Sequence, residues 1–171
     1  MSSTSIQAKM FKAVSANTAA VAALQTTAGA ADFNLTSSSV SDGSNMATTV
    51  TLTSAGNISG VNFTITGTDE NGDAVSETRA GPNANTVATT EAFLTVTGVS
   101  VDAAVGTNTS VGFSATSTTK GIVFAGATRV RGMHGVSKAS AAGAMIIRNG
   151  SQSGDKRLEL DAPAAAGMID P

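Results

Sequence analysis

The chain has 171 residues and 41% of them are hydrophobic, but its only aromatic residues are six Phe, with no Trp and no Tyr. The absence of Cys excludes disulfides, thiolate metal sites and cysteine nucleophiles. The net charge of −2 hides an asymmetry, because residues 32–119 hold eight acids and one base, whereas residues 120–171 hold seven bases and four acids.

Small residues dominate the chain. Large side chains supply most of the burial energy of a fold, about 1.5–3 kcal/mol each, and Ala, Gly, Ser and Thr supply little of it. Ordering the backbone costs about 1–2 kcal/mol per residue. We therefore expect a lone copy to be marginally stable and neighbouring subunits to supply the missing burial.

Residues 1–31 differ from the rest of the chain and are predicted to form an N-terminal arm, weakly structured alone and ordered by a partner. A short docking helix is the alternative, because apolar residues recur loosely along this segment, at Ile6, Met10, Phe11, Val14, Val21 and Leu24. The segment lacks the basic start and apolar core of a secretory signal, and Ala13–Leu24 is too short and polar to span a bilayer. We expect a soluble protein made in the cytoplasm.

Residues 32–115 are predicted to form a β-rich lobe of short antiparallel strands, because short β-prone runs alternate with turn residues every 8–12 residues. The strands are expected at Phe33–Leu35, Thr48–Thr53, Val61–Thr66, Ala74–Thr78, Thr86–Thr89, Phe93–Val101 and Ser110–Phe113. Turns are expected at Asp42-Gly43, Ala55-Gly56-Asn57, Asn71-Gly72, Gly81-Pro82-Asn83 and Val105–Asn108.

The strongest of these signals is Val61–Asn83, VNFTITGTDENGDAVSETRAGPN. Apolar Val61, Phe63 and Ile65 alternate with polar residues up to Asn71-Gly72, which predicts a hairpin with a two-residue turn and φ > 0 at both central residues. Further on, Leu94 and Val96 share one parity while Val99 and Val101 share the other. A bulge at Gly98 would reset the register.

Residues 116–171 are predicted to form a second, smaller β-rich lobe. Strands are expected at Gly121–Phe124, Thr128–Met133, Ala144–Arg148 and Lys156–Asp161, with a loop at Asn149–Gly154 and with Leu158 and Leu160 facing inward. Met168-Ile169 favours a last strand over a short helix starting at Ala164, and its edge would stay unpaired unless a neighbour completes it. The expected fold class is all-β, with β-sandwich or barrel-like lobes and an extended or partly helical N-terminal arm.

Residues with the potential for chemistry are few. A Ser/His/Asp triad would need the single His134, and no G-x-S-x-G elbow accompanies it. Asp69-x-Asn71-Gly72-Asp73 resembles a calcium loop only faintly, since it lacks the glycine and glutamate that an EF-hand requires, and a hairpin turn explains the same residues. Arg129 and Arg131 project onto one face of a strand, which favours an acidic protein partner over a nucleic acid, because no stacking aromatic lies near them. We expect no enzyme activity, no cofactor and no metal.

The run Thr48–Gly112 resembles a group of small virion proteins of tailed bacteriophages. These proteins carry a segment like TxTSAGNxSGxxFTxxGTDxNGxxxxETxxGPN, read here from Thr51 through Gly56-Asn57, Phe63 and Asp69 to Gly81-Pro82-Asn83. Gln25–Ala31 and Leu160–Gly167 also fit this group, whose members usually continue with one more hairpin beyond the position of Pro171.

The resemblance implies a capsid-associated protein, a decoration or cement subunit located in the virion. The expected partners are the major capsid protein and neighbouring copies of the chain, forming a homo-oligomer without membrane or nucleic acid. A neck or tail ring component is the alternative, and a carbohydrate- or receptor-binding adhesion module ranks below it. The residues expected to contact other subunits are Phe11, Asp69, Asp73, Arg129, Arg131, Lys138, Arg148 and Arg157.

Overall fold

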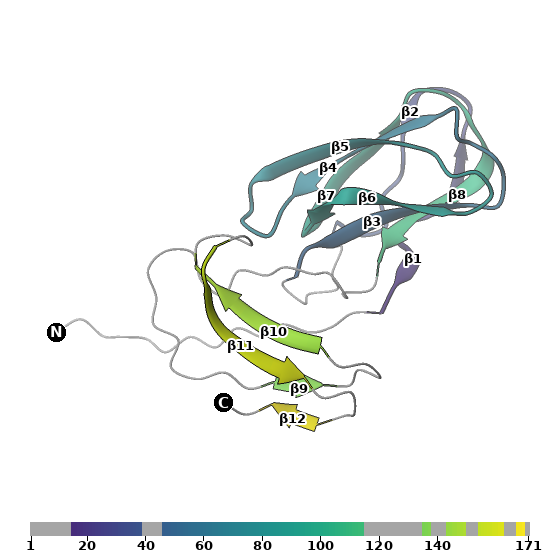
Figure 1. Ribbon diagram of the computed structural model, residues 1–171. Coiled ribbons are helices and arrows are strands. Elements are labelled where there is room, and N and C mark those ends of the chain that lie inside the picture. The colour runs from purple at the N-terminus through teal and green to yellow at the C-terminus, as the bar shows by residue number, and fades with distance from the viewer. Residues whose placement is uncertain are drawn as a thin grey trace. The chain divides into compact units, whose positions relative to one another are not determined.

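The computed structural model describes residues 15–38, 46–114, 135–137, 143–149, 154–162 and 167–169. The chain divides into two compact units, unit 1 (Met1–Ala125) and unit 2 (Gly126–Pro171). The described residues form antiparallel sheets and no helix, which confirms the all-β prediction (Figure 1). The expected boundary at 115/116 lies at the start of residues 115–134, which are outside the described residues.

Unit 1 holds eight strands in two four-stranded sheets with the orders β1-β8-β3-β6 and β2-β7-β4-β5. The strands are β1 (Asn17–Thr27), β2 (Ala31–Asp32), β3 (Thr48–Ser54), β4 (Asn62–Thr68), β5 (Ala74–Ala80), β6 (Thr86–Phe93), β7 (Thr95–Val101) and β8 (Val105–Phe113).

The pairing in unit 1 runs from the two ends of the strand sequence inward. The first strand pairs with the eighth, the second with the seventh, the third with the sixth and the fourth with the fifth, all antiparallel. Two further pairings, β3 with β8 and β4 with β7, complete the two sheets. The chain is therefore one long folded-over hairpin whose tip is the turn between β4 and β5.

Both sheets contribute to one buried apolar cluster. Alternate residues of β3 and β4 point into it, among them Val50, Leu52, Phe63 and Ile65, each fully buried. Val50 and Leu52 are thus inward-facing, as the alternation predicts. The ring of Phe63 meets that of Phe33 edge-on with centroids 5.6 Å apart, a favourable geometry for two aromatic rings.

The β4–β5 hairpin is confirmed, but its turn differs from the expected one. The strands pair without interruption from Asn62↔Ala80 to Thr68↔Ala74, which leaves residues 69–73 for the turn. Gly72 has φ +86° and donates its N–H to the carbonyl of Asp69, whereas Asn71 keeps a negative φ. The expectation of two left-handed residues is wrong: only the glycine adopts that conformation, and the turn is longer.

The predicted bulge in β7 is confirmed. The pairing of β4 with β7 runs from Phe63↔Val101 to Thr66↔Gly98 and then shifts at Gly67↔Val96. The shift allows Val96 and Val99 both to be buried, although they have opposite parity.

Part of the expected N-terminal arm belongs to unit 1 instead. Asn17–Thr27 is strand β1, neither helix nor free arm, and its Val21 and Ala22 lie in the core. Its pairing with β8 shifts register between every pair of matched residues, from Asn17↔Phe113 to Thr27↔Val105. These irregularities explain why the sequence lacks a clean alternation there. Residues 1–14 are outside the described residues.

Smaller differences concern strand ends. The turn expected at Val105–Asn108 is wrong, because those residues open β8, and residues 102–104 make the connection from β7. Phe93 ends β6 and does not open β7. The strand expected at Phe33–Leu35 is wrong, because β2 is Ala31–Asp32 and ends just before it. The Phe33 N–H still donates to the carbonyl of Val99.

The lateral openings between the two sheets are bridged by hydrogen bonds. On the side of β1 and β2, the side chain of Gln25 exchanges two 3.0 Å hydrogen bonds with the backbone of Asn34. The N–H groups of Thr36 and Ser37 both donate to the carbonyl of Val21. The chain after β2 thus ties the edge strand of one sheet to that of the other.

Unit 2 contains two two-stranded sheets, β10 (Gly143–Arg148) with β11 (Lys156–Ala162), and β9 (Gly135–Ser137) with β12 (Gly167–Ile169). The strands expected at Ala144–Arg148, Lys156–Asp161 and Met168-Ile169 are confirmed. The expected unpaired last strand has a partner on one side, since β12 pairs with β9. The strands expected at Gly121–Phe124 and Thr128–Met133 lie outside the described residues.

Candidate functional site

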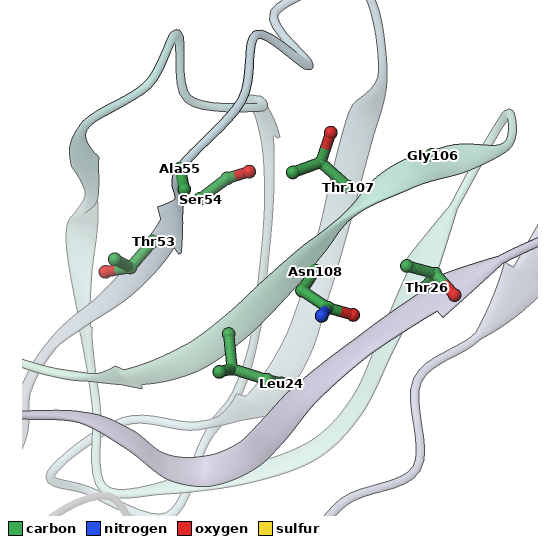
Figure 2. A pocket seen from close by; sticks show the side chains of 8 residues that line it. All are labelled: Leu24, Thr26, Thr53, Ser54, Ala55, Gly106, Thr107 and Asn108. Atoms are coloured by element: carbon green, nitrogen blue, oxygen red, sulfur yellow. The ribbon is translucent and has the colours of Figure 1, made fainter.

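An open depression lies on the solvent-facing side of the β1-β8-β3 part of unit 1. It has a volume of about 600 Å³ and is lined by residues of three adjacent strands and the turn after β3: Leu24, Thr26, Thr53, Ser54, Ala55, Gly106, Thr107 and Asn108 (Figure 2). We call this surface the Leu24 groove. None of its lining residues is charged, so it suits an apolar or uncharged partner surface.

Leu24 is the residue that makes this groove unusual. Its side chain is 63% exposed, although its strand also contributes the buried Val21 to the core. On the neighbouring strand β8 the positions are small or polar, with Gly106 and Asn108 exposed. An exposed leucine beside a flat, uncharged strip is a surface that can bury apolar area against another molecule.

The β4–β5 turn is held in shape by one carboxylate. Asp69 accepts hydrogen bonds from the backbone N–H groups of Asn71 (2.8 Å) and Asp73 (2.9 Å) and from the side-chain amide of Asn71 (3.0 Å). Desolvation raises the pKa of Asp69, but hydrogen bonds from Asn71, Asp73 and Gly72 outweigh it, so the pKa lies below its usual value. The carboxylate shapes the turn, as the hairpin interpretation predicts.

Asp102 plays a similar part where β7 ends beside the start of β4. It accepts hydrogen bonds from the backbone N–H (2.8 Å) and the side-chain amide (2.7 Å) of Asn62. The backbone bond and then the side-chain bond hold the pKa of Asp102 below its usual value.

Glu77 joins the two sheets on the side of β5 and β6. Its carboxylate accepts hydrogen bonds from the N–H of Thr90 (2.9 and 3.0 Å) and of Glu91 (2.8 Å). Those residues lie where the pairing of β3 with β6 shifts register, so their N–H groups are outside the regular ladder. Glu77 therefore ties an edge that would otherwise offer free donors.

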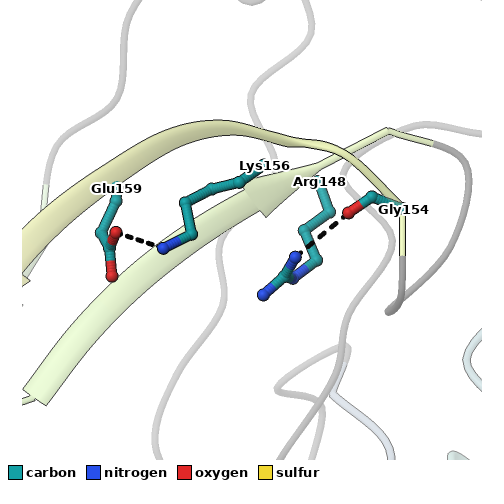
Figure 3. A network of polar contacts seen from close by, with 4 residues as sticks. All are labelled: Arg148, Gly154, Lys156 and Glu159. Carbon is teal, nitrogen blue, oxygen red and sulfur yellow. Dashed lines mark hydrogen bonds and ion pairs between the residues drawn. The ribbon is translucent and has the colours of Figure 1, made fainter.

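The polar contacts of unit 2 gather at one end of its β10–β11 hairpin. Arg148 donates to the carbonyl of Gly154 at 3.1 Å, and Lys156 forms an ion pair with Glu159 (Figure 3). Arg157 lies 3.6 Å from Asp155. The two ion pairs are exposed, and exposed ion pairs contribute little to stability.

The structure brings together only some of the expected contact residues. Asp69 and Asp73 share the β4–β5 turn, and Arg148 and Arg157 flank the loop of the β10–β11 hairpin. Phe11, Arg129, Arg131, Lys138 and the lone His134 lie outside the described residues. The contact role of all of these residues stays a prediction.

Sequence reasoning misses two exposed apolar side chains. It places Leu24 in a loose helical stripe and Ile146 in a strand without a role, yet they are 63% and 38% exposed. No clean alternation around Leu24 marks it as facing solvent, because the residues that follow it, Gln25 and Thr26, are both polar. No local signal marks Ile146.

The motif residues that carry the phage resemblance meet at one end of unit 1. The backbone of Ala84 donates to Gly56, and that of Ile58 donates to Pro82, so the loop after β3 and the loop after β5 run side by side. Asn57 and Asn83 pair as an isolated bridge between them. These motif residues build a loop contact that holds the fold.

Within the described residues, no group of three His, Cys, Asp or Glu side chains is arranged to hold a metal ion. No helix in that part of the chain is long and apolar enough to cross a bilayer.

Comparison of the chain with protein-family models, with curated proteins and with solved structures finds no match.

Proposed function

We propose that this chain is a non-enzymatic structural protein of a tailed-phage virion, a decoration or cement subunit that bridges capsid subunits. The observation that carries the proposal is the pairing order of unit 1, first strand with last and so on inward. That order belongs to the eight-stranded jelly roll, in which two sheets pack as a β-sandwich. Jelly rolls build viral capsid domains and also lectins and cupins.

A fold alone does not assign a function, so the virion role needs support from elsewhere. The first support is the resemblance of Thr48–Gly112 to small phage virion proteins. The second is the place of the motif residues in the fold, since Asn57 and Asn83 form a bridge and the carbonyls of Gly56 and Pro82 accept hydrogen bonds between the same two loops. Residues that fix the shape of the fold are what a structural subunit requires.

Sugar recognition, the function of jelly-roll lectins, is the less favoured use of the same architecture. Sugar sites commonly rest on Trp or Tyr platforms, and the whole chain contains neither. The Leu24 groove is lined by aliphatic, hydroxyl and amide groups, which fit a protein surface better.

The proposed partners are the major capsid protein and other copies of this chain, and the proposed location is the virion. The test is to purify virions from cells infected by the phage that encodes the chain, and to determine the copy number and position of the chain by quantitative mass spectrometry and image reconstruction, with an antibody against the chain as the label. Copies in the hundreds on the shell support decoration. A closed set on the order of six or twelve at one vertex supports a neck or tail ring. Absence of the chain from purified virions overturns the proposal.

A further inference from the structure

The two large apolar side chains that are exposed in the described residues lie on different units. Leu24 is on β1 of unit 1 and Ile146 is on β10 of unit 2. An exposed Leu or Ile alone is ordinary, but here each one belongs to a wider surface that can bury apolar area against a partner.

The Leu24 groove offers room as well as apolar area. A side-chain atom added at Gly106 would meet nothing within 4 Å, so the strip beside Leu24 is open above the backbone. The lining residues carry no charge, which means that an apolar occupant meets no buried charge there.

The β10–β11 hairpin of unit 2 lacks such enclosure. It pairs from Gly143↔Ala162 to Arg148↔Lys156, and among the described strands it forms a sheet of two. Of its side chains whose burial the structure describes, none is buried; Ile147, Leu158 and Leu160 are half-buried and Ile146 is exposed. Two-stranded sheets are marginal in water unless they pack on another surface.

The two units carry opposite charge. Unit 1 has eight acidic and four basic residues, a net charge of −4, and unit 2 has six basic and four acidic residues, a net charge of +2. Opposite net charges steer two surfaces toward each other and disfavour pairing of like with like. They favour unit 2 of one copy against unit 1 of another over a symmetric contact of two acidic units.

We propose that the β10–β11 hairpin of one copy docks in the Leu24 groove of a second copy, with Ile146 against Leu24. The occupant of the groove is therefore this same protein, and the contact is head-to-tail. Because each copy keeps one free groove and one free hairpin, the contact propagates into rings or open chains. The docking contact rests on the proposed function and deepens it, since it names the surfaces through which copies associate.

The test uses two full-length variants that each lose one half of the contact, Leu24→Asp and Ile146→Asp. The wild-type protein is expected to gain mass with concentration in sedimentation velocity, with a dissociation constant on the order of ten micromolar. Each variant alone is expected to bind itself at least about tenfold more weakly. An equimolar mixture is expected to form a one-to-one heterodimer and nothing larger, because the hairpin of the Leu24→Asp copy meets the intact groove of the Ile146→Asp copy.

A matched control introduces the same charge on the outer side of the other sheet, at the exposed Ser76. Ser76→Asp is expected to associate like the wild type, and circular dichroism spectra of all variants should coincide. Raising the salt from about 0.05 to 0.5 M should weaken wild-type association several-fold, since opposite net charges assist it.

Three results would overturn the inference. The first is a wild-type protein that stays monomeric at all concentrations. Docking of the hairpin in the groove of its own chain would give this result. Association that survives both substitutions is another. A mixture that fails to form the heterodimer points to a symmetric contact and is the third. Each of these leaves the copy number in virions untouched, so the failure of this inference is distinguishable from the failure of the proposed function.

Discussion

Unit 1 and unit 2 are built from the same kind of short antiparallel strand but enclose their apolar residues to very different degrees. In unit 1, residues of both sheets share a cluster in which Leu52, Phe63 and Phe93 are fully buried. In unit 2, the described side chains of β10 and β11 are half-buried or exposed. The described strands of unit 1 form two four-stranded sheets, whereas those described in unit 2 form two-stranded ones.

This contrast places the described core of the chain in unit 1, and under our proposal it places an assembly surface in unit 2. A sheet of four strands buries one face over a shared core, whereas a two-stranded ribbon needs another surface to do so. Composition alone predicts that the whole chain depends on burial against neighbouring subunits for its stability. The structure assigns unit 1 a core of its own, and for unit 2 the expectation stays a prediction.

The largest expected effect separates the two units by truncating a side chain in each. Phe63→Ala should lower the free energy of unfolding of unit 1 by about 3–5 kcal/mol, since the fully buried ring also loses its contact with Phe33. Leu158→Ala in half-buried β11 should cost less than about 1.5 kcal/mol. Hydrogen exchange resolved by peptide reports each unit separately. Equal loss of protection in both units for either variant would mean that they unfold as one body.

The next effect concerns the seam between β1 and β8. A Cβ at Gly112 would lie 1.9 Å from the carbonyl oxygen of Asn17, so Gly112→Ala must displace the backbone of β1 and should cost about 1–3 kcal/mol. Gly106→Ala in the same strand meets open space and should change stability by less than about 0.5 kcal/mol. Chemical denaturation followed by circular dichroism gives both values. Equal midpoints for the two variants would contradict the close crossing of β1 over β8.

A smaller effect tests the tie between β5 and β6. Glu77→Ala removes the acceptor of the Thr90 and Glu91 N–H groups and should cost about 1–2 kcal/mol, less than a buried charged hydrogen bond because the site is partly exposed. Amide exchange at residues 90 and 91 should speed up about tenfold. Glu70→Ala, a turn carboxylate of the same unit, serves as the control and should leave these amides protected. Unchanged exchange in Glu77→Ala would show that the tie does not hold the edge.

The smallest effect is a pH dependence at the β4–β5 turn. The pKa of Asp69 is lower in the folded chain than in the unfolded one, so its stabilisation is complete above the unfolded pKa of about 3.9 and is lost as the pH falls through the folded value. Wild type should have a higher unfolding midpoint than Asp69→Asn at pH 7, and the difference between the two midpoints should shrink as the pH falls below the unfolded pKa. A gap that stays constant with pH would exclude the carboxylate charge as its cause.

The parts of the fold that the sequence predicts are those in which pattern and turn lie close together. Phe63 and Ile65 alternate with threonines, and Gly72 follows within a few residues, so the β4–β5 hairpin is readable locally. The bulge of β7 is readable for the same reason, because Val96 and Val99 break parity around Gly98.

The parts that sequence reasoning misses depend on distant partners. The register shifts between β1 and β8 interrupt the alternation of β1. Val21 becomes a core residue only through its packing against strands far along the chain. Gly106 and Asn108 are residue types that favour turns, but they occupy solvent-facing positions of strand β8. Glu77 is separated from Thr90 by 13 residues and by a change of sheet, so no local pattern could reveal their contact. The exposure of Leu24, which defines the groove, follows from β1 being a strand and is missed together with it.

The inward pairing of unit 1 also implies an order in which its strands pair during folding. Each pairing step outward from the β4–β5 turn joins residues further apart in the sequence, ending with Asn17 beside Phe113. Contacts between distant residues form slowly, and a ribosome adds about 5–20 residues per second. We expect β1 to leave the ribosome first and to find its partner last, several seconds later. During that interval the growing chain carries an unpaired strand, and chaperones that shield such strands would meet it there.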